Sequence, residues 1–309
     1  MPSLKNLKDR IGSVKSTKKI TSAMKMVAAS KLRKAQEQAE ASQPYATAMA
    51  EMLNRIAKNI IVNDNSPRLL VGTGREEVVC LLVVTSDRGL CGGFNSNLVR
   101  KVREEIRSLS GQGKQIRLIC AGRKGYDLLK HEFGSRILHK FTNIGSQSKI
   151  SFSEVDKITQ YILEQFEEGS FDVCKLVYNE FQSVIKQKPS VHKLIPFDLE
   201  SGSGVVSNTE QKNVKTDKVN TGPYSPYTFE PDEEEILSKL LPRNLGIQVY
   251  RAILDSAAGE QAARMTAMDN ATRNAGDMIK SLTLQYNRER QAYITKELIE
   301  IISGAEALN

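Results

Sequence analysis

The sequence lacks tryptophan altogether, and only 6% of its 309 residues are aromatic. Such a composition favours helices that pack through small aliphatic side chains. Long apolar runs are also missing, since the longest is the seven-residue stretch 78–84, VVCLLVV. A membrane-spanning helix needs about 20 apolar residues, so the chain is not expected to insert into a bilayer. The N-terminal residues MPSLKNLKDR contain no apolar stretch of a secretion signal, and export is not expected.

Cysteine and histidine are too few and too scattered to indicate a metal site or a disulfide framework. The four cysteines are Cys80, Cys91, Cys120 and Cys174, and no two of them form a CxxC pair. The three histidines show no metal-ligand spacing. We therefore expect no bound metal or cofactor, and we expect reduced, partly buried thiols in a cytosolic protein.

A glycine-rich loop, SDRGLCGGFN at 86–95, follows the apolar stretch and precedes a helical pattern. Nucleotide-binding folds place a phosphate-binding loop at this position. The loop matches neither GxGxxG nor GxxxxGK followed by Ser or Thr, and neither pattern occurs elsewhere in the chain. Tight turns that let the loop and helix pack closely are the favoured interpretation. Cys91 has no evident histidine or asparagine partner, so no catalytic residue is assigned.

The positive charge of the chain is concentrated in one segment. The formal net charge is +8, and residues 1–60 alone hold 12 Lys and Arg against four acids. A basic segment on an otherwise balanced chain implies an acidic partner, which could be nucleic acid, anionic lipid or an acidic protein surface. The run 31–34, KLRK, could contact nucleic acid, but residues 1–44 contain no aromatic side chain for base stacking.

The first sixty residues follow one unbroken seven-residue repeat. Its a positions are Leu4, Ile11, Lys18, Lys25, Leu32, Ala39, Ala46, Leu53 and Ile60. Its d positions are Leu7, Val14, Thr21, Ala28, Ala35, Ser42, Met49 and Ile56. This spacing predicts a helix of about 85 Å that packs against a partner helix in a left-handed coiled coil. Pro44 should bend or loosen the helix locally.

The repeat weakens between Lys18 and Lys25, where the seam carries Lys, Thr and Lys. The apolar residues of this region lie off the seam: Ile20, Met24, Met26 and Val27. A helix of this kind contacts a second surface as well as its coiled-coil partner. A local stutter in the seam explains the same pattern equally well, so both explanations stay open.

A second helical pattern runs from about Leu245 to Ser303, between Pro242 and a stop signal at Gly304. Its apolar stripe includes Ile247, Tyr250, Leu254, Ala257, Met265, Met268, Thr272, Ala275, Ile279, Leu282, Tyr286 and Tyr293. Its length is close to 90 Å, about that of the first helix. Two rods of equal length at opposite ends of the chain are predicted to pair with each other as an antiparallel coiled coil.

Between the rods, apolar stretches alternate with helical patterns. The expected strands are 78–85, 116–121, 173–178 and 184–196, the last at an edge because Pro189 and Pro196 suit one. The expected helices are 95–109, 124–131 and 153–168. This alternation predicts a central Rossmann-like α/β domain with a mostly parallel sheet.

These patterns divide the chain into four segments. We expect an N-terminal coiled-coil helix at 1–62, a central α/β domain at 75–198, a flexible loop at 199–231 and a C-terminal coiled-coil helix at 232–309 that pairs with 1–62. The loop is rich in Ser, Gly, Asn and Pro, which disfavour a packed structure. The predicted fold class is therefore α/β, with a long two-helix coiled coil beside a small sheet domain.

Four stretches resemble the gamma subunit of F-type ATP synthases. The run 11–33, IGSVKSTKKITSAMKMVAASKLR, is similar to that family's opening helix, and SDRGLCGGFN at 86–95 is similar to the loop after its first strand. EQAARMTAMDNATRNAGDMI at 260–279 and RQAYITKELIEIISGAEAL at 290–308 resemble its C-terminal helix. Residues 199–231 depart from the family pattern, because they are longer than in many bacterial members and lack the paired cysteines of the chloroplast regulatory insert.

The resemblance implies a non-catalytic central shaft in a rotary motor. Such a shaft couples proton flow through the c-ring to the cycle of the catalytic subunits, which make ATP or hydrolyse it in reverse, and it regulates ATPase activity and proton flow. The implied partners are the alternating ring of alpha and beta subunits, the epsilon subunit and the c-ring, with no nucleic acid and no cofactor. The implied location is peripheral, at the cytoplasmic face of a bacterial inner membrane.

The resemblance also implies two contact sites for the catalytic ring. By position, Met24 and Lys25 fall on a zone that meets acidic loops of the catalytic subunits. Arg290 and Gln291 match a polar pair that catches a loop of a catalytic subunit, although from the residues alone they are surface positions. Two rival functions are a nucleotide hydrolase with coiled-coil arms, which the missing phosphate loop disfavours, and a coiled-coil protein that binds nucleic acid.

Overall fold

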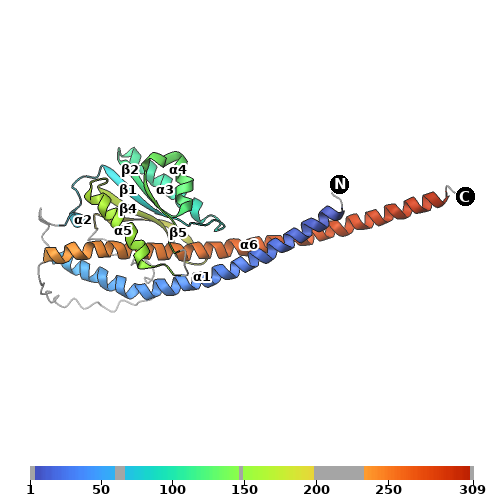
Figure 1. Cartoon of the computed structure of the whole chain (residues 1–309), viewed down its shortest axis with the longest axis horizontal. Helices are drawn as coiled ribbons and strands as arrows, with labels where there is room; N and C mark the ends of the chain where they lie inside the picture. The colour runs from blue at the N-terminus through green and yellow to red at the C-terminus, as the bar shows by residue number, and fades with distance from the viewer. Residues whose placement is uncertain (1–3, 60–66, 146–148, 198–232, 307–309) are drawn as a thin grey trace. The chain divides into compact units, whose positions relative to one another are not determined.

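The computed structural model describes residues 4–59, 67–145, 149–197 and 233–306 (Figure 1). The chain divides into a smaller unit, residues 1–29 with 264–309, and a larger unit, residues 30–263. Two long helices, α1 (Leu4–Asn59) and α6 (Glu233–Glu306), contribute to both units. The predicted loop at 199–231 lies outside the described residues.

The larger unit contains a sheet with the strand order β3-β2-β1-β4-β5. Its strands are β1 (Val78–Val84), β2 (Gln115–Ala121), β3 (Ile137–Phe141), β4 (Val173–Phe181) and β5 (Gln187–Ile195). The first four strands are parallel, and β5 pairs antiparallel with β4. The predictions of a mostly parallel sheet and of an edge strand containing Pro189 are confirmed.

Helices cover both faces of this sheet (Figure 1). They are α3 (Phe94–Gly111), α4 (Arg123–Phe133), α5 (Phe152–Glu167) and α6. On β1, Leu81 and Val83 pack on the side of α3 and α4, whereas Cys80 and Leu82 pack on the side of α5 and α6. Because successive side chains of a strand point to opposite faces, a strand buried on both faces is apolar at every position. This is why VVCLLVV forms the central strand.

The part of α6 that covers the sheet is enclosed on several sides. Leu245, Val249 and Ile253 belong to the core between α6, α5 and the sheet. A second cluster joins α6 to α1 and to the short helix α2 (Arg68–Val71); it contains Ala46, Met49, Leu53, Leu70, Leu237, Leu241 and Ile247. The helix therefore serves at once as a coiled-coil strand and as a layer of the α/β domain.

α6 begins earlier than the sequence pattern predicts. The helix starts at Glu233, so Pro242 lies inside it, and the predicted start near Leu245 is wrong. Leu237 and Leu241 are buried on the proline's N-terminal side. Burying two leucines contributes about 3–6 kcal/mol, which offsets the roughly 3 kcal/mol that a proline costs within a helix. Pro44 likewise lies inside α1.

In the smaller unit α1 and α6 run antiparallel, as predicted. Thr21 is hydrogen-bonded to Thr272, and Lys25 to Asp269, so residue numbers fall along α6 as they rise along α1. Among the described side chains of α1, all the buried ones occupy predicted a or d positions: Leu7, Thr21, Ala28, Leu32, Ala46, Met49 and Leu53. The seven-residue repeat therefore identified the seam correctly.

The two long helices are not of equal length. α1 has 56 residues and α6 has 74, so the prediction of equal rods is wrong. All described side chains from 290 to 303 are exposed. Tyr293, which was predicted to continue the apolar stripe, is 54% exposed and lies outside any seam in the described residues.

Candidate partner-binding surface

The first predicted contact site, Met24 and Lys25, lies in the smaller unit on α1. The Lys25 ammonium donates to Asp269 Oδ1 at 2.5 Å, and Asp269 also accepts a hydrogen bond from Arg273, one turn along α6. These two cations, Lys25 foremost, lower the pKa of the Asp269 carboxyl. The Lys25 side chain is engaged within the chain yet stays 45% exposed. Its ammonium has three N–H donors, so it can still bind a partner's carboxylate.

Away from the seam, exposed apolar side chains form what we call the outer patch of α1. Its members Ile20, Met26 and Val27 are 60%, 66% and 57% exposed. Met24 is half-buried. The seam itself continues through this region, because Thr21 and Ala28 are buried at consecutive d positions. The continuous seam disfavours a local stutter and leaves the outer patch available to a second surface.

The second predicted contact site, Arg290 and Gln291, is exposed on α6. Asp269, which binds Lys25, precedes Arg290 by 21 residues on the same helix. At 1.5 Å per residue this separation is about 32 Å along the helix axis. The two predicted pairs therefore lie at two separate positions along the helix pair.

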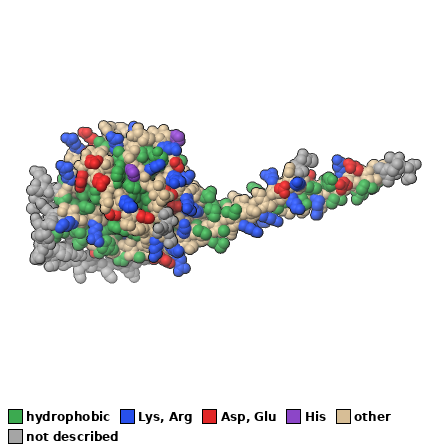
Figure 2. Space-filling view, in the orientation of Figure 1, with side chains coloured by type: hydrophobic (Ala, Val, Ile, Leu, Met, Phe, Trp, Pro, Cys, Tyr) green, Lys and Arg blue, Asp and Glu red, His purple; other side chains and the backbone are tan. Residues whose placement is uncertain are grey.

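An apolar surface that the sequence pattern did not predict lies at the end of α6, and we call it the apolar tip. Its large side chains are all more than half exposed: Tyr293, Ile294, Leu298, Ile299, Ile301 and Ile302. Hydrophobic side chains are visible on the surface near this end of the helix (Figure 2). The signal in the sequence was the two adjacent pairs at 298–299 and 301–302, which a single coiled-coil stripe cannot accommodate.

The glycine-rich loop at 86–95 is filled by its own side chains. The Asp87 carboxylate accepts hydrogen bonds from the backbone N–H groups of Arg123 at 2.8 Å and Asn143 at 2.7 Å. Asn95 accepts from the Ser86 backbone N–H at 3.1 Å and donates to the Ser86 hydroxyl at 2.7 Å. Arg123 begins α4, so Asp87 caps the N-terminus of α4, while Asn95, in the first turn of α3, is turned back onto Ser86 of the loop. This geometry supports the structural interpretation of the loop.

The cysteines are buried. All four are free thiols. Burial raises the pKa of Cys120 to about 12, and the contact with Cys174 together with burial raises that of Cys80. A thiol must lose its proton to act as a nucleophile, so these two are inert at neutral pH. Within the described ranges, His, Cys, Asp and Glu side chains form no cluster suited to a metal ion.

No helix among the described residues is both long and apolar enough to cross a membrane.

Comparison with known proteins decides the family. A family model described as ATP synthase matches residues 3–308. The ATP synthase gamma chain of Sinorhizobium medicae is 52% identical over 308 residues, with both chains fully covered. The chain belongs to the ATP synthase gamma chain family. The gamma chain of Granulibacter bethesdensis is also 52% identical over the full length of both chains.

Solved structures support the same assignment. A chain of the Tetrahymena thermophila mitochondrial ATP synthase central stalk and c-ring is 26% identical, with a TM-score of 0.58 over 82% of this chain and 99% of that one. A rotor chain of the Euglena gracilis mitochondrial ATP synthase shares the fold at 20% identity, with a TM-score of 0.64 over 94% and 98% of the two chains. The resemblance drawn from four sequence stretches is thus confirmed, and the chain is a non-catalytic subunit of the gamma chain family.

Proposed function

We propose that the chain is the central rotor shaft of a bacterial F-type ATP synthase. It couples proton flow through the c-ring to the conformational cycle of the catalytic subunits, which make ATP or hydrolyse it in reverse. Its rotation thereby regulates ATPase activity and proton flow together. The observation that carries the proposal is 52% identity, over the full length of both chains, to bacterial ATP synthase gamma chains.

The proposed partners are the alternating ring of alpha and beta subunits, the epsilon subunit and the c-ring. The Tetrahymena relative is described with a central stalk and a c-ring, which supports the last of these. In this proposal the chain lies at the cytoplasmic face of the inner membrane and is held there by its partners. The bacterial origin of the full-length relatives supports this location.

The apolar tip of α6 supports insertion into a ring. Successive helical residues are turned by about 100°, so the six apolar residues spread over roughly 240° of the helix circumference. One flat surface cannot cover such a spread, whereas a sleeve of several subunits can. Exposed apolar surface of this extent marks a protein contact. The ring of alpha and beta subunits is the proposed sleeve.

The outer patch of α1 supports a second contact with the ring. Ile20, Met26 and Val27 offer apolar surface, and Lys25, which precedes Met26 in the chain, offers a half-exposed cation. An acidic loop with apolar neighbours on a catalytic subunit would satisfy both. Met24 and Lys25 are proposed to meet this loop, while Arg290 and Gln291 are proposed to hold another.

The experiment that tests the proposal is reconstitution with the catalytic ring and the membrane sector in vesicles. The double variant Arg290→Ala with Gln291→Ala should lower proton-driven ATP synthesis several-fold, because both side chains are exposed and available to a loop. A matched control is Arg107→Ala with Ser108→Ala, an adjacent exposed pair on α3. Far-ultraviolet circular dichroism should report the same helix content in both variants.

Equal ATP synthesis by both double variants would remove Arg290 and Gln291 from the proposed contact. Purification of the tagged wild-type chain from native membranes tests the wider proposal. Catalytic ring subunits should co-purify with it. An ATPase activity of the isolated chain, or salt-dependent retention on DNA without ring subunits, would instead favour the hydrolase or the nucleic-acid binder.

A further inference from the structure

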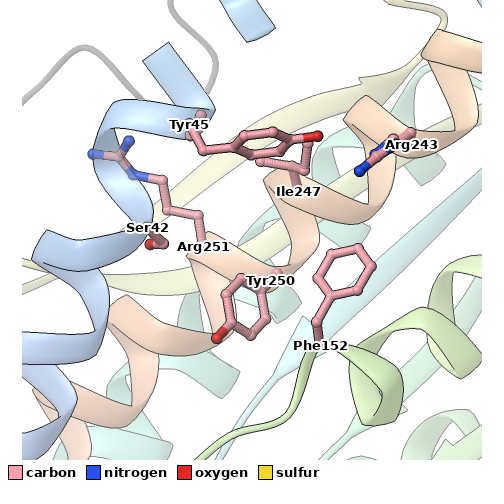
Figure 3. A pocket seen from close by; sticks show the side chains of 8 residues that line it. Ser42, Tyr45, Phe152, Arg243, Ile247, Tyr250 and Arg251 are labelled. Carbon is pink, nitrogen blue, oxygen red and sulfur yellow. The ribbon is translucent and has the colours of Figure 1, made fainter. Parts of the chain in front are cut away.

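A cleft of about 190 Å³ lies between α1, α5 and α6 within the larger unit (Figure 3). α1 contributes Ser42 and Tyr45, and α5 contributes Phe152, the first residue of that helix. The remaining wall comes from the buried part of α6. No residue of the outer patch, the apolar tip or the two proposed contact pairs lines this cleft.

The cleft carries two cations and no acidic residue. Arg251 is 7% exposed, and among the described residues its Nη1 atom has no hydrogen-bond partner. Figure 3 shows its side chain extending from α6 toward α1, where Ser42 and Tyr45 lie. Arg243 also lines the cleft, with its guanidinium carbon 5.8 Å from the centre of the Tyr45 ring.

A buried guanidinium nitrogen without a hydrogen-bond acceptor is unfavourable, because it has lost its bonds to water and gained none in return. Asp255 follows Arg251 by one turn of α6, and the charge of Arg251 lowers its pKa against the larger, raising effect of burial. Asp255 does not line the cleft. An anion bound in the cleft would therefore supply Arg251 with the acceptor that its Nη1 lacks.

The other walls are aromatic and held in place. The rings of Phe152 and Tyr250 meet edge to face, with centroids 5.5 Å apart. The Tyr250 hydroxyl accepts from Gln38 Nε2 at 2.9 Å and donates to the Ile150 carbonyl at 3.3 Å. Rings fixed in this way can stack on a ligand without losing further rotational freedom.

The size of the cleft limits the ligand. An apolar cavity of about 150 Å³ is large enough to hold one benzene molecule. A cleft of about 190 Å³ therefore accommodates one six-membered ring with a small substituent.

We propose that this cleft binds a small aromatic anion, a single ring that carries a carboxylate. The ring packs among Tyr45, Phe152 and Tyr250, and the carboxylate faces Arg251. A bound ligand joins α1 to α5 and α6 within the larger unit, so it stabilises that unit by mass action. The proposal concerns a binding site that the rotary function does not require.

The test uses the full chain and two probes of nearly the same shape, 4-fluorobenzoate and the neutral 4-fluorobenzamide, observed by fluorine NMR titration. The benzoate should bind about tenfold more tightly, because one charge-assisted hydrogen bond contributes enough for that ratio. It should also raise the Tm of the larger unit. Equal affinities for the two probes, or no benzoate binding up to millimolar concentration, would overturn the proposal.

Variants locate the site. Arg251→Gln should weaken benzoate binding about tenfold and leave benzamide binding unchanged, since only the benzoate needs the cation. Arg107→Gln, an exposed arginine on α3, is the matched control and should change neither affinity. If Arg251→Gln fails to fold, Ser42→Phe tests the site instead. Ser42 is half-buried in the wall of the cleft, so the larger phenylalanine side chain should fill the cleft without leaving a polar group unpaired. Ser42→Phe should abolish binding of both probes, and unchanged binding would place them elsewhere and refute the site.

Discussion

The larger unit should become more stable when Asp255 loses its charge. Asp255 lies on the enclosed part of α6, and burial raises the pKa of its carboxyl to about 6, against the lowering effect of Arg251 and with a further raising effect from Glu180. The substitution Asp255→Asn keeps the shape of the side chain and removes the ionisation. We expect this variant to be more stable than the wild type at pH 8 and nearly equal to it at pH 4.

The magnitude follows from proton linkage. The ordinary pKa of Asp is 3.8 and the folded-state pKa is about 6. At about 1.4 kcal/mol per pKa unit, the charged carboxylate destabilises the folded state by up to about 3 kcal/mol above pH 6. A raised folded-state pKa means that the folded state binds more protons, so the wild-type stability falls as the pH rises from about 4 to about 6. This fall is absent from the variant.

The assay is urea unfolding of both proteins at pH 4 and pH 8, followed by circular dichroism. Subtracting the unfolding free energy of the wild type from that of the variant cancels the contribution of every group that titrates in the same way in both proteins. We expect the difference in unfolding free energy to increase by about 2–3 kcal/mol from pH 4 to pH 8 in favour of the variant. A variant that is less stable than the wild type at pH 8 would show instead that Asp255 and Arg251 form a strong ion pair, and would refute the reasoning.

Four further substitutions test the packing by thermal or urea unfolding. Gly125→Ala should destabilise the larger unit by about 1–3 kcal/mol, because an added Cβ would lie 2.7 Å from Thr85 Oγ1. Gly12→Ala should instead stabilise α1 by about 0.5–1 kcal/mol, because an added Cβ there would have nothing within 4 Å. The opposite sign for either substitution would contradict this account of the two glycines. Leu254→Ala should cost about 2–5 kcal/mol, since Leu254 is fully buried on α6, and a loss below 1 kcal/mol would mean that α6 is loosely packed. Asp87→Asn should cost about 1–3 kcal/mol, because an amide has one acceptor oxygen for two backbone donors, and unchanged stability would show that the loop does not depend on this carboxylate.

The sequence predicted the periodic features of the fold well. A seven-residue repeat places on one seam every side chain of α1 that the structure describes as buried, because only one helical face can meet a partner. The central strand was equally clear, since a strand buried on both faces is apolar throughout. By contrast, β3 is a short strand whose residues His139 and Lys140 are exposed, and no apolar run distinguishes it from a loop.

The start of α6 was missed because local propensity and tertiary packing disagree there. A proline usually marks a helix boundary. Leu237 and Leu241, which precede Pro242, nevertheless pack against apolar residues of α1 and α2, and this burial keeps the segment helical. A second omission was the partner of Lys25. The repeat predicts that the two terminal helices pair, but it does not predict their register, that is, which residue of α6 lies opposite Lys25. In the structure the register places Asp269 there, and its carboxylate binds the Lys25 ammonium.

The candidate sites were only partly accessible to sequence reasoning. Arg290 and Gln291 came from the family resemblance, and their side chains are exposed as a contact would require. Tyr293, a residue of the apolar tip, was wrongly predicted to face a partner helix. The spacing of apolar residues predicts which face of α6 is apolar, but it does not predict where the partner helix ends. The cleft beside Arg251 combines residues from three helices that are far apart in sequence, and only their assembly in the larger unit brings them together.

The most direct test of the proposed shaft is observation of single assembled complexes with a bead attached to this chain and the catalytic ring fixed to a surface. A variant carrying Thr21→Cys and Thr272→Cys should form a disulfide across the seam, since the two hydroxyl oxygens are 2.8 Å apart. The bead should rotate during ATP hydrolysis, with the disulfide either formed or reduced, because α1 and α6 turn as one body. Sustained hydrolysis by a fully assembled complex in which the bead stands still would contradict the account.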